Sequence, residues 1–217
     1  MRFPRLVLVL LLAVGLLYCF GARAPQQYGS GREFHDLAAF KAYRMKLLEK
    51  QDSLMQSQQF DLDDNGSLEK FNLSNGMITV RASSRIIWQS PDDWWVNYFF
   101  LGDANNDGMA ELNLLVWKEG SFGPYKPFWL EEEEEDTSIK NHLFIFKLVS
   151  DSIKPVWQSS NLDRPNYRAA LIDLNNDGEN ELLVTEGSYT DPTWQAITLW
   201  KWNGWGFSRQ GDRDLSG

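Results

Sequence analysis

The chain has 217 residues, enough for one compact domain and a short additional segment. Its 21 Lys and Arg residues against 30 Asp and Glu residues give a formal net charge of −9, which disfavours binding to a nucleic-acid backbone. The 43% hydrophobic and 24% charged residues are typical of a globular protein and argue against a largely disordered chain. The only cysteine is Cys19, so an intrachain disulfide is excluded, and two histidines exclude a metal site built from three histidines.

The N-terminal segment has the layout of an export signal. Arg2 and Arg5 precede an uncharged, mostly apolar stretch from Leu6 to Ala22. The two cations are expected to stay in the cytoplasm, so the rest of the chain lies outside it. The stretch has 17 residues, the short end of what spans a bilayer. Residues 1–24 are therefore predicted to be a cleaved signal peptide or an uncleaved signal anchor, with a buried core helix as a third alternative.

Residues 25–58 are predicted to form a short polar linker followed by one amphipathic helix. The segment from Glu33 to Gln58 contains neither Pro nor Gly, and its apolar residues recur at helical spacing. These residues are Phe34, Leu37, Phe40, Tyr43, Leu47, Leu48, Leu54 and Met55. The helix either packs on the domain that follows, which we expect, or serves as a stalk or partner-binding helix.

Three acidic segments repeat along the rest of the chain and share the pattern D-x-[DN]-x-[DN]-G-x-x-E. They begin at Asp61, Asp103 and Asp173, and we name them the first, second and third loop (residues 61–69, 103–111 and 173–181). A Trp-Gln-Ser marker begins 15 residues before the second loop and 16 before the third. Two markers in register indicate an internal duplication, which is typical of propellers, solenoids and repeat arrays.

Each repeat is predicted to be all-β, because short apolar runs alternate with turn signals such as Asn203-Gly204. The expected strands cover residues 77–81 and 85–88; 98–101, 112–117, 143–149 and 153–157; and 169–172, 182–185, 196–202 and 206–209. Residues 59–210 are therefore predicted to be an all-β, propeller-like array of about three four-stranded blades. An insertion covers residues 118–140, and residues 211–217 form a polar tail.

The three loops carry the residue types of a calcium site. A hard cation takes several oxygen ligands at once, and the loops contain no His or Cys. Positions 1, 3 and 5 supply side-chain oxygens, glycine at position 6 permits a sharp turn, position 7 offers its backbone carbonyl and position 9 adds a carboxylate. The expected ligands are Asp61, Asp63, Asn65, Ser67 and Glu69; Asp103, Asn105, Asp107, Met109 and Glu111; and Asp173, Asn175, Asp177, Glu179 and Glu181.

The loops are not EF-hands, because position 12, where an EF-hand has a bidentate Glu, is Asn72, Leu114 or Val184. The alternative is that they are Asx-rich turns between strands that hold no metal. Their repetition favours calcium, most clearly in the second and third loops, because Asn65 replaces an acid at position 5 of the first.

The segments DANNDGMAEL and DLNNDGENEL resemble the calcium loops of FG-GAP and VCBS-type repeat proteins, the β-propeller family that includes the integrin α-chain head. The resemblance covers about residues 59–210 and implies a propeller fold stabilised by calcium. It implies no single function, because such repeats occur in adhesins, receptors and domains appended to carbohydrate enzymes. The chain has no clear FG…GAP stretch, and three units are fewer than the 4–8 blades of a closed ring. An open stack, a cap from the N-terminal helix or assembly of several copies are the alternatives.

These features predict an extracytoplasmic, calcium-stabilised binding module that is secreted or membrane-anchored and recognises a protein or a polysaccharide. Trp94, Trp95, Trp129 and Trp194 either stack on sugar rings or fill gaps between blades. No catalysis is expected, because the chain has no G-x-S-x-G motif and no nucleotide-binding glycine loop. The alternatives are an accessory subunit that docks onto a membrane-associated complex through residues 33–58, and a carbohydrate-active hydrolase or lyase with a carboxylate pair.

Overall fold

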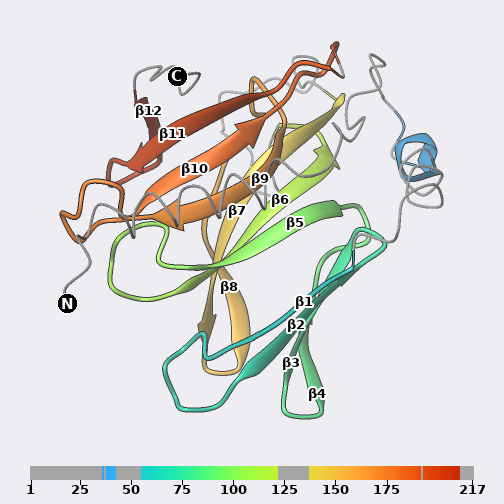
Figure 1. The fold of residues 1–217 in the computed structure, drawn as a ribbon. Helices are drawn as coiled ribbons and strands as arrows, with labels where there is room; N and C mark the ends of the chain where they lie inside the picture. Colours follow the sequence, from blue (N-terminus) through green and yellow to red (C-terminus); the bar gives the residue numbers. More distant parts are fainter. Residues whose placement is uncertain (1–35, 37, 43–54, 122–136, 192, 211–217) are drawn as a thin grey trace, which may run out of the picture.

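A computed structural model describes residues 36, 38–42, 55–121, 137–191 and 193–210 of the chain. Within these residues, three four-stranded antiparallel sheets form an all-β fold (Figure 1). The first sheet contains β1 (Gln56–Phe60), β2 (Glu69–Ser74), β3 (Met77–Ala82) and β4 (Arg85–Gln89). The second contains β5 (Trp95–Gly102), β6 (Glu111–Glu119), β7 (Ile139–Val149) and β8 (Ser152–Gln158). The third contains β9 (Asn166–Ile172), β10 (Glu181–Glu186), β11 (Ala196–Trp202) and β12 (Phe207–Gln210).

Each sheet is a simple meander, in which strands consecutive in sequence are neighbours in space. The tight turns carry residues that accept a left-handed backbone, such as Asn75 and Gly76 between β2 and β3, with φ of 51° and 78°. In every sheet the first and second strands are joined by one of the three acidic loops. The prediction of three four-stranded units is therefore confirmed.

One predicted boundary is wrong. Residues 56–58, expected at the end of the amphipathic helix, belong to β1, which pairs with β2 along its whole length. The side chain of Gln56 also brackets the backbone of Phe99, since its Nε2 donates to the Phe99 carbonyl at 2.7 Å and its Oε1 accepts from the Phe99 N–H at 3.3 Å. These partners from distant parts of the chain outweigh the local helical pattern, so the β region begins at residue 56 rather than 59.

A helical turn at residues 38–42 lies against the second sheet. Asp36 begins it, because its side chain accepts hydrogen bonds from the backbone of Ala38 and Ala39. Phe40 is only 4% exposed, and its ring lies 5.3 Å from that of Trp117 and 6.5 Å from that of Trp95. The packed alternative therefore holds for this part of the predicted helix.

The predicted leader (1–24), the linker, the remaining part of the amphipathic helix up to residue 54, and the polar tail lie outside the described residues. In the part of the chain that the structure describes, no helix is both long and apolar enough to span a membrane.

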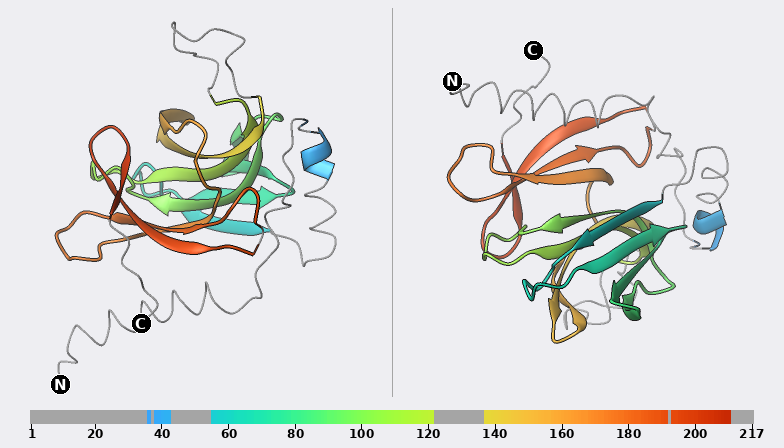
Figure 2. Two further views of the ribbon diagram at one scale, coloured as in Figure 1. Left: turned by 90° about the horizontal axis from the view of Figure 1, so that it is seen from above. Right: turned by 60° about the horizontal axis from the view of Figure 1, so that its bottom comes forward.

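The sheets pack face to face in chain order, with the second sheet between the other two (Figure 2). Because side chains alternate along a strand, Leu114 and Val116 of β6 face the first sheet while Leu115 faces the third. The first core contains Phe71, Leu73, Ile78, Val80, Leu112, Phe144 and Phe146, and the second contains Leu143, Ala169, Leu182 and Val184. The described residues thus form an open stack of three sheets, and no ring closure is formed among them.

Candidate metal centre

The three acidic loops join β1 to β2, β5 to β6 and β9 to β10, and all lie on one side of the molecule, at the left in Figure 1. Position 4 of each loop has a left-handed backbone, with φ of 55° at Asp64, 58° at Asn106 and 60° at Asn176. The glycine at position 6 has φ of 84°, 84° and 88° in the three loops. These two left-handed positions reverse the chain within each loop, which explains the Asp or Asn at position 4 and the glycine at position 6.

The carboxylates at positions 1 and 9 hold each loop in the same shape. Asp61 accepts hydrogen bonds from the backbone N–H groups of Asn65 and Gly66 at 3.0 and 2.7 Å, and Asp103 and Asp173 do the same in their loops. The glutamate at position 9 accepts from the N–H of position 2, at 3.0, 2.7 and 2.9 Å in loop order. The shared sequence pattern therefore gives the three loops of this chain the same shape.

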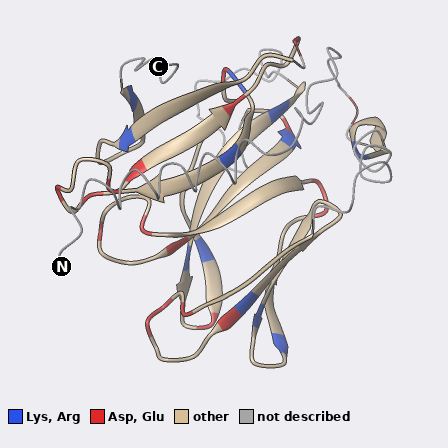
Figure 3. Ribbon diagram, viewed as in Figure 1, with Lys and Arg blue, Asp and Glu red and all other residues tan. Residues whose placement is uncertain are grey.

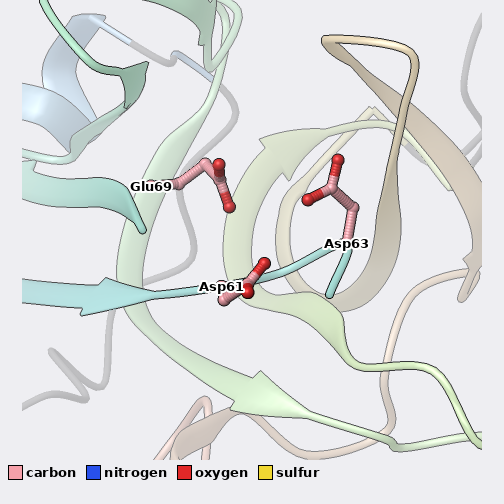
Figure 4. Close-up of side chains that lie close together, drawn as sticks. All are labelled: Asp61, Asp63 and Glu69. Atoms are coloured by element: carbon pink, nitrogen blue, oxygen red, sulfur yellow. The ribbon is translucent and has the colours of Figure 1, made fainter. Parts of the chain in front are cut away.

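In the first loop, three carboxylates converge. Asp61, Asp63 and Glu69 each place an oxygen within 4.8 Å of the others (Figure 4), and Glu69 is only 2% exposed. Oδ1 of Asp63 is buried and has no hydrogen-bond partner. Burial raises the pKa of Glu69, and the neighbouring charges of Asp63 and Asp61 raise it further. This group could hold a metal ion, because a cation between the carboxylates would offset their repulsion.

In the second loop, Asp103, Asp107 and Glu111 also lie within 4.8 Å of one another. Glu111 is fully buried, and this burial, together with the charges of Asp103 and Asp107, raises its pKa to about 7. A cation from the protein itself is already present, because the Lys147 ammonium on β7 contacts Asp107 and lies 3.5 Å from Oε1 of Glu111. Although burial acts in the opposite direction, the hydrogen bond from Lys147 lowers the pKa of Asp107.

In the third loop, Asp173, Asp177 and Glu181 do not form a comparably close group among the described residues. The Lys201 ammonium on β11 lies between the acids instead, at 3.1 Å from Asp177, 2.9 Å from Glu179 and 3.9 Å from Glu181. Hydrogen bonds to Glu179 and Asp177 raise the pKa of Lys201. Glu179, predicted to contribute its backbone carbonyl to a metal, here uses its side chain to bind a lysine.

The residue at position 3 is a further difference between the loops. In the second loop Nδ2 of Asn105 donates to Asp107 at 3.1 Å, and in the third Nδ2 of Asn175 donates to Asp177 at 2.9 Å. The first loop has Asp63 at this position, so its third side chain brings a carboxylate instead of an N–H donor. At this position the first loop therefore has a carboxylate where the other two loops have an amide N–H donor.

The second and third loops are also joined to each other. Asn106 donates to the backbone carbonyl of Asn180 at 3.1 Å and accepts from its N–H at 2.7 Å. The side chain of Asn180 donates to the carbonyl of Asp103 at 2.9 Å. These three bonds fix the relative position of the two loops at the junction between the second and third sheets.

Lys147 and Lys201 were not predicted as site residues from the sequence. Both follow an aromatic residue within an apolar stretch of the third strand of their repeat, Phe-Lys-Leu at 146–148 and Trp-Lys-Trp at 200–202. This local pattern is a usable signal, but it becomes meaningful only when the strand register sets each lysine beside its loop. Figure 3 shows Asp and Glu residues, in red, in the loops and at strand ends, and Lys and Arg residues, in blue, on the strands.

The tryptophans predicted as candidate sugar-stacking residues are mostly packed. Trp95 is buried, and the ring of Trp94 lies 5.0 Å from that of Phe144. Trp194 is covered by Arg164, whose guanidinium lies 4.3 Å from the ring, and Trp129 lies outside the described residues. Trp205, on the turn between β11 and β12, is 79% exposed. Gap filling therefore accounts for Trp94 and Trp95, while Trp205 is an exposed aromatic that the sequence analysis did not select.

No protein-family model matches the chain, and no curated protein matches it. The class of the protein is therefore defined by its own structure. It is an all-β repeat of three four-stranded antiparallel sheets, with an acidic loop after the first strand of each and two acidic triads that could hold a metal ion.

Proposed function

We propose that this protein is a calcium-stabilised, propeller-like binding module that acts outside the cytoplasm and performs no catalysis. The observation that carries the calcium assignment is the convergence of the carboxylates of Asp61, Asp63 and Glu69, of which Glu69 is buried. All the side-chain atoms that meet there are oxygens, which favours calcium over zinc or copper. A calcium ion bound by these carboxylates would also link the end of β1 to the start of β2, so it would stabilise the first sheet.

The role of calcium in this proposal is to stabilise the fold rather than to act as a switch. Extracellular modules bind calcium with Kd values of ~10⁻⁴ to 10⁻³ M. A site with free calcium at tenfold its Kd adds about 1.4 kcal/mol to the free energy of unfolding. That amount is a useful fraction of the total stability of a single domain.

The binding role is supported by the arrangement of the loops and by the leader. Residues 1–24 have the layout of a signal peptide or anchor, which would place the sheets outside the cytoplasm. The three loops lie on one side of the stack and form a rim suited to recognising a protein or a polysaccharide. Trp205 supplies an exposed aromatic ring that could stack against a sugar.

The alternatives have less support. Docking through residues 33–58 would need the apolar face of that segment to be free, and Phe40 is buried against Trp95 and Trp117. A hydrolase or lyase would need an accessible acid–base pair. The carboxylates that lie closest together are those of the loops, which this proposal assigns to calcium.

Calcium binding can be tested on the full chain in detergent, by calorimetric titration and by thermal melts in calcium and in chelator. We expect saturable binding and a higher melting temperature in calcium. Asp63→Asn should weaken binding by about tenfold or more, because it removes one carboxylate from the group. The fold should survive, because the other two loops carry asparagine at the same position.

Asp64→Asn is the matched control. Asp64 is the next residue in the chain, its side chain is exposed and it lies outside the triad, so the variant removes the same charge without removing a carboxylate of the group. It should leave calcium affinity nearly unchanged. Absence of binding by the wild-type chain, or equal loss in the two variants, would contradict a calcium site in the first loop.

A further inference from the structure

The second and third loops each receive a lysine at the acids expected to hold a metal. We propose that Lys147 and Lys201 are built-in cations that replace calcium in these two loops, so that the first loop is the only one of the three that takes the ion. This inference rests on the proposed calcium binding and specifies where it occurs. It reverses the ranking drawn from sequence, in which the second and third loops were the better candidates.

Strand register places the two lysines. Lys201 of β11 pairs directly with Glu181, the acid at position 9 of the third loop. In the second sheet Leu112 pairs with Phe146, so the next residue, Lys147, stands beside Glu111. Because cross-strand partners point to the same face of a sheet, each lysine lies on the same face as the glutamate at position 9 of its loop.

The first sheet has no cation at the corresponding place. The partner of Glu69 is Ala82, whose methyl side chain carries no charge. The neighbouring pair, Lys70 and Arg81, points to the opposite face by strand alternation, and both residues are exposed. Asp61, Asp63 and Glu69 form no ion pair with any Lys or Arg among the described residues.

The lysines compete with calcium in two ways. Each ammonium donates to the carboxylate oxygens that a metal would need, and it also reduces the negative charge of its loop by one. The side chain of Lys147 is 14% exposed and that of Lys201 is 31% exposed, and each ammonium contacts at least two acids of its loop. A divalent ion entering the second or third loop would therefore stay close to a positive charge that repels it.

A second observation supports an ion in the first loop. Oδ1 of Asp63 is buried without a hydrogen-bond partner, and the Asp63 carboxylate lies near those of Asp61 and Glu69 (Figure 4). Oε1 of Glu111 in the second loop is also buried without a hydrogen bond, but the Lys147 ammonium lies 3.5 Å from it. The corresponding side chains of the other loops, Asn105 and Asn175, already bond to the backbone and to an acid within their own loop. A buried acceptor without a donor is costly, and a cation is the partner that suits a carboxylate oxygen.

The number of bound calcium ions tests this inference, measured on the full chain in detergent by calorimetry and by metal analysis after equilibrium dialysis. The wild-type chain should bind one ion. Lys147→Met and Lys201→Met should each add one ion, because methionine keeps the length of the side chain and removes the ammonium. Lys147→Arg is the matched control that keeps the charge, and it should still bind one.

Introducing a lysine into the first sheet provides a second test if a lysine-to-methionine variant does not fold. Ala82→Lys introduces an ammonium beside Glu69 and should lower calcium affinity of the first loop at least tenfold. Ala82→Met, of similar size and uncharged, should retain binding.

The outcomes separate this inference from the proposed function. One ion in the wild type that Asp63→Asn weakens, with one more in each methionine variant, would support both. Two or three ions in the wild type would overturn the role of the lysines while leaving the calcium proposal intact. No calcium in the wild type or in either methionine variant would overturn the calcium proposal itself, and the inference with it.

Discussion

At the scale of single residues, burial of charged and titratable groups dominates the behaviour of this protein. His142 on β7 is fully buried, and its Nδ1–H donates to the carbonyl of Ser159 at 3.2 Å. Burial, together with the nearby charge of Lys118, lowers the pKa of His142 to about 4. The ring is therefore neutral in the folded protein near neutral pH.

The depressed pKa of His142 predicts a loss of stability in mild acid. Below its ordinary pKa the unfolded chain takes up a proton that the folded protein excludes, so the free energy of unfolding falls as the pH decreases from about 6.5 towards 4. The full shift corresponds to roughly 3 kcal/mol. Urea unfolding of the wild type and of His142→Asn should therefore be compared at several pH values between 7 and 4.5, in chelator.

The asparagine variant should be less stable at pH 7, because it leaves a cavity, but its stability should fall less steeply with acid. The carboxylates of the loops contribute equally in both proteins, so the difference between the two slopes reports on His142. Parallel pH dependences would contradict a neutral, buried histidine.

At the scale of single elements, tight turns decide how the sheets come together. The turn between β2 and β3 contains Gly76, which has a φ of 78°. Its carbonyl accepts a hydrogen bond from the N–H of Val96 at 2.8 Å, so the turn docks directly onto β5. A Cβ atom at residue 76 would lie 2.4 to 2.9 Å from the indole ring of Trp95. Glycine is therefore needed there both for its backbone conformation and for the close approach of the ring.

Gly76→Ala should consequently destabilise the protein by more than backbone strain alone. A left-handed alanine costs about 1–2 kcal/mol, and overpacking against the buried Trp95 adds a further 1–3 kcal/mol. Gly204→Ala is the control, because Gly204 has a φ of 98° and nothing within 4 Å of its Cβ position. Urea unfolding should show a clearly larger loss for the first variant, and equal losses would argue against contact between the turn and Trp95.

At the scale of the whole molecule, the stack has two unlike end faces. By strand alternation, the outer face of the third sheet presents Leu183 and Leu199, while that of the first sheet presents Lys70 and Arg81. Assembly of several copies into a ring stays a prediction.

The helical turn at residues 38–42 is expected to contribute to the stability of the whole stack. Phe40 fills a site between Trp95 and Trp117, at the edge of the second sheet. Phe40→Ala should lower the free energy of unfolding by about 3 kcal/mol, the low end for loss of a buried phenylalanine. Met55→Ala, at a residue that is 64% exposed, should change it by less than about 0.5 kcal/mol. Equal midpoints for the two variants in urea would mean that residues 38–42 do not stabilise the sheets.

The features that are encoded locally can be predicted from the amino-acid sequence alone. The Asp and Gly positions of the loops, the Asn-Gly turns and the alternating strands each depend on a few neighbouring residues, so their pattern predicts three four-stranded units. The export-type leader and the resemblance to FG-GAP and VCBS repeats likewise come from the sequence, and they are the basis for proposing a binding role outside the cytoplasm.

Features that depend on residues far apart in the chain could not be predicted in this way and required the three-dimensional structure. Residues 56–58 are a strand because β2 pairs with them, although their own pattern continues a helix. Trp95 is buried because the turn at Gly76 and the ring of Phe40 cover it. Above all, strand register sets Lys201 opposite Glu181 and Ala82 opposite Glu69. Three loops with almost the same sequence thereby acquire different charge environments, because the side chain that completes each site comes from another strand.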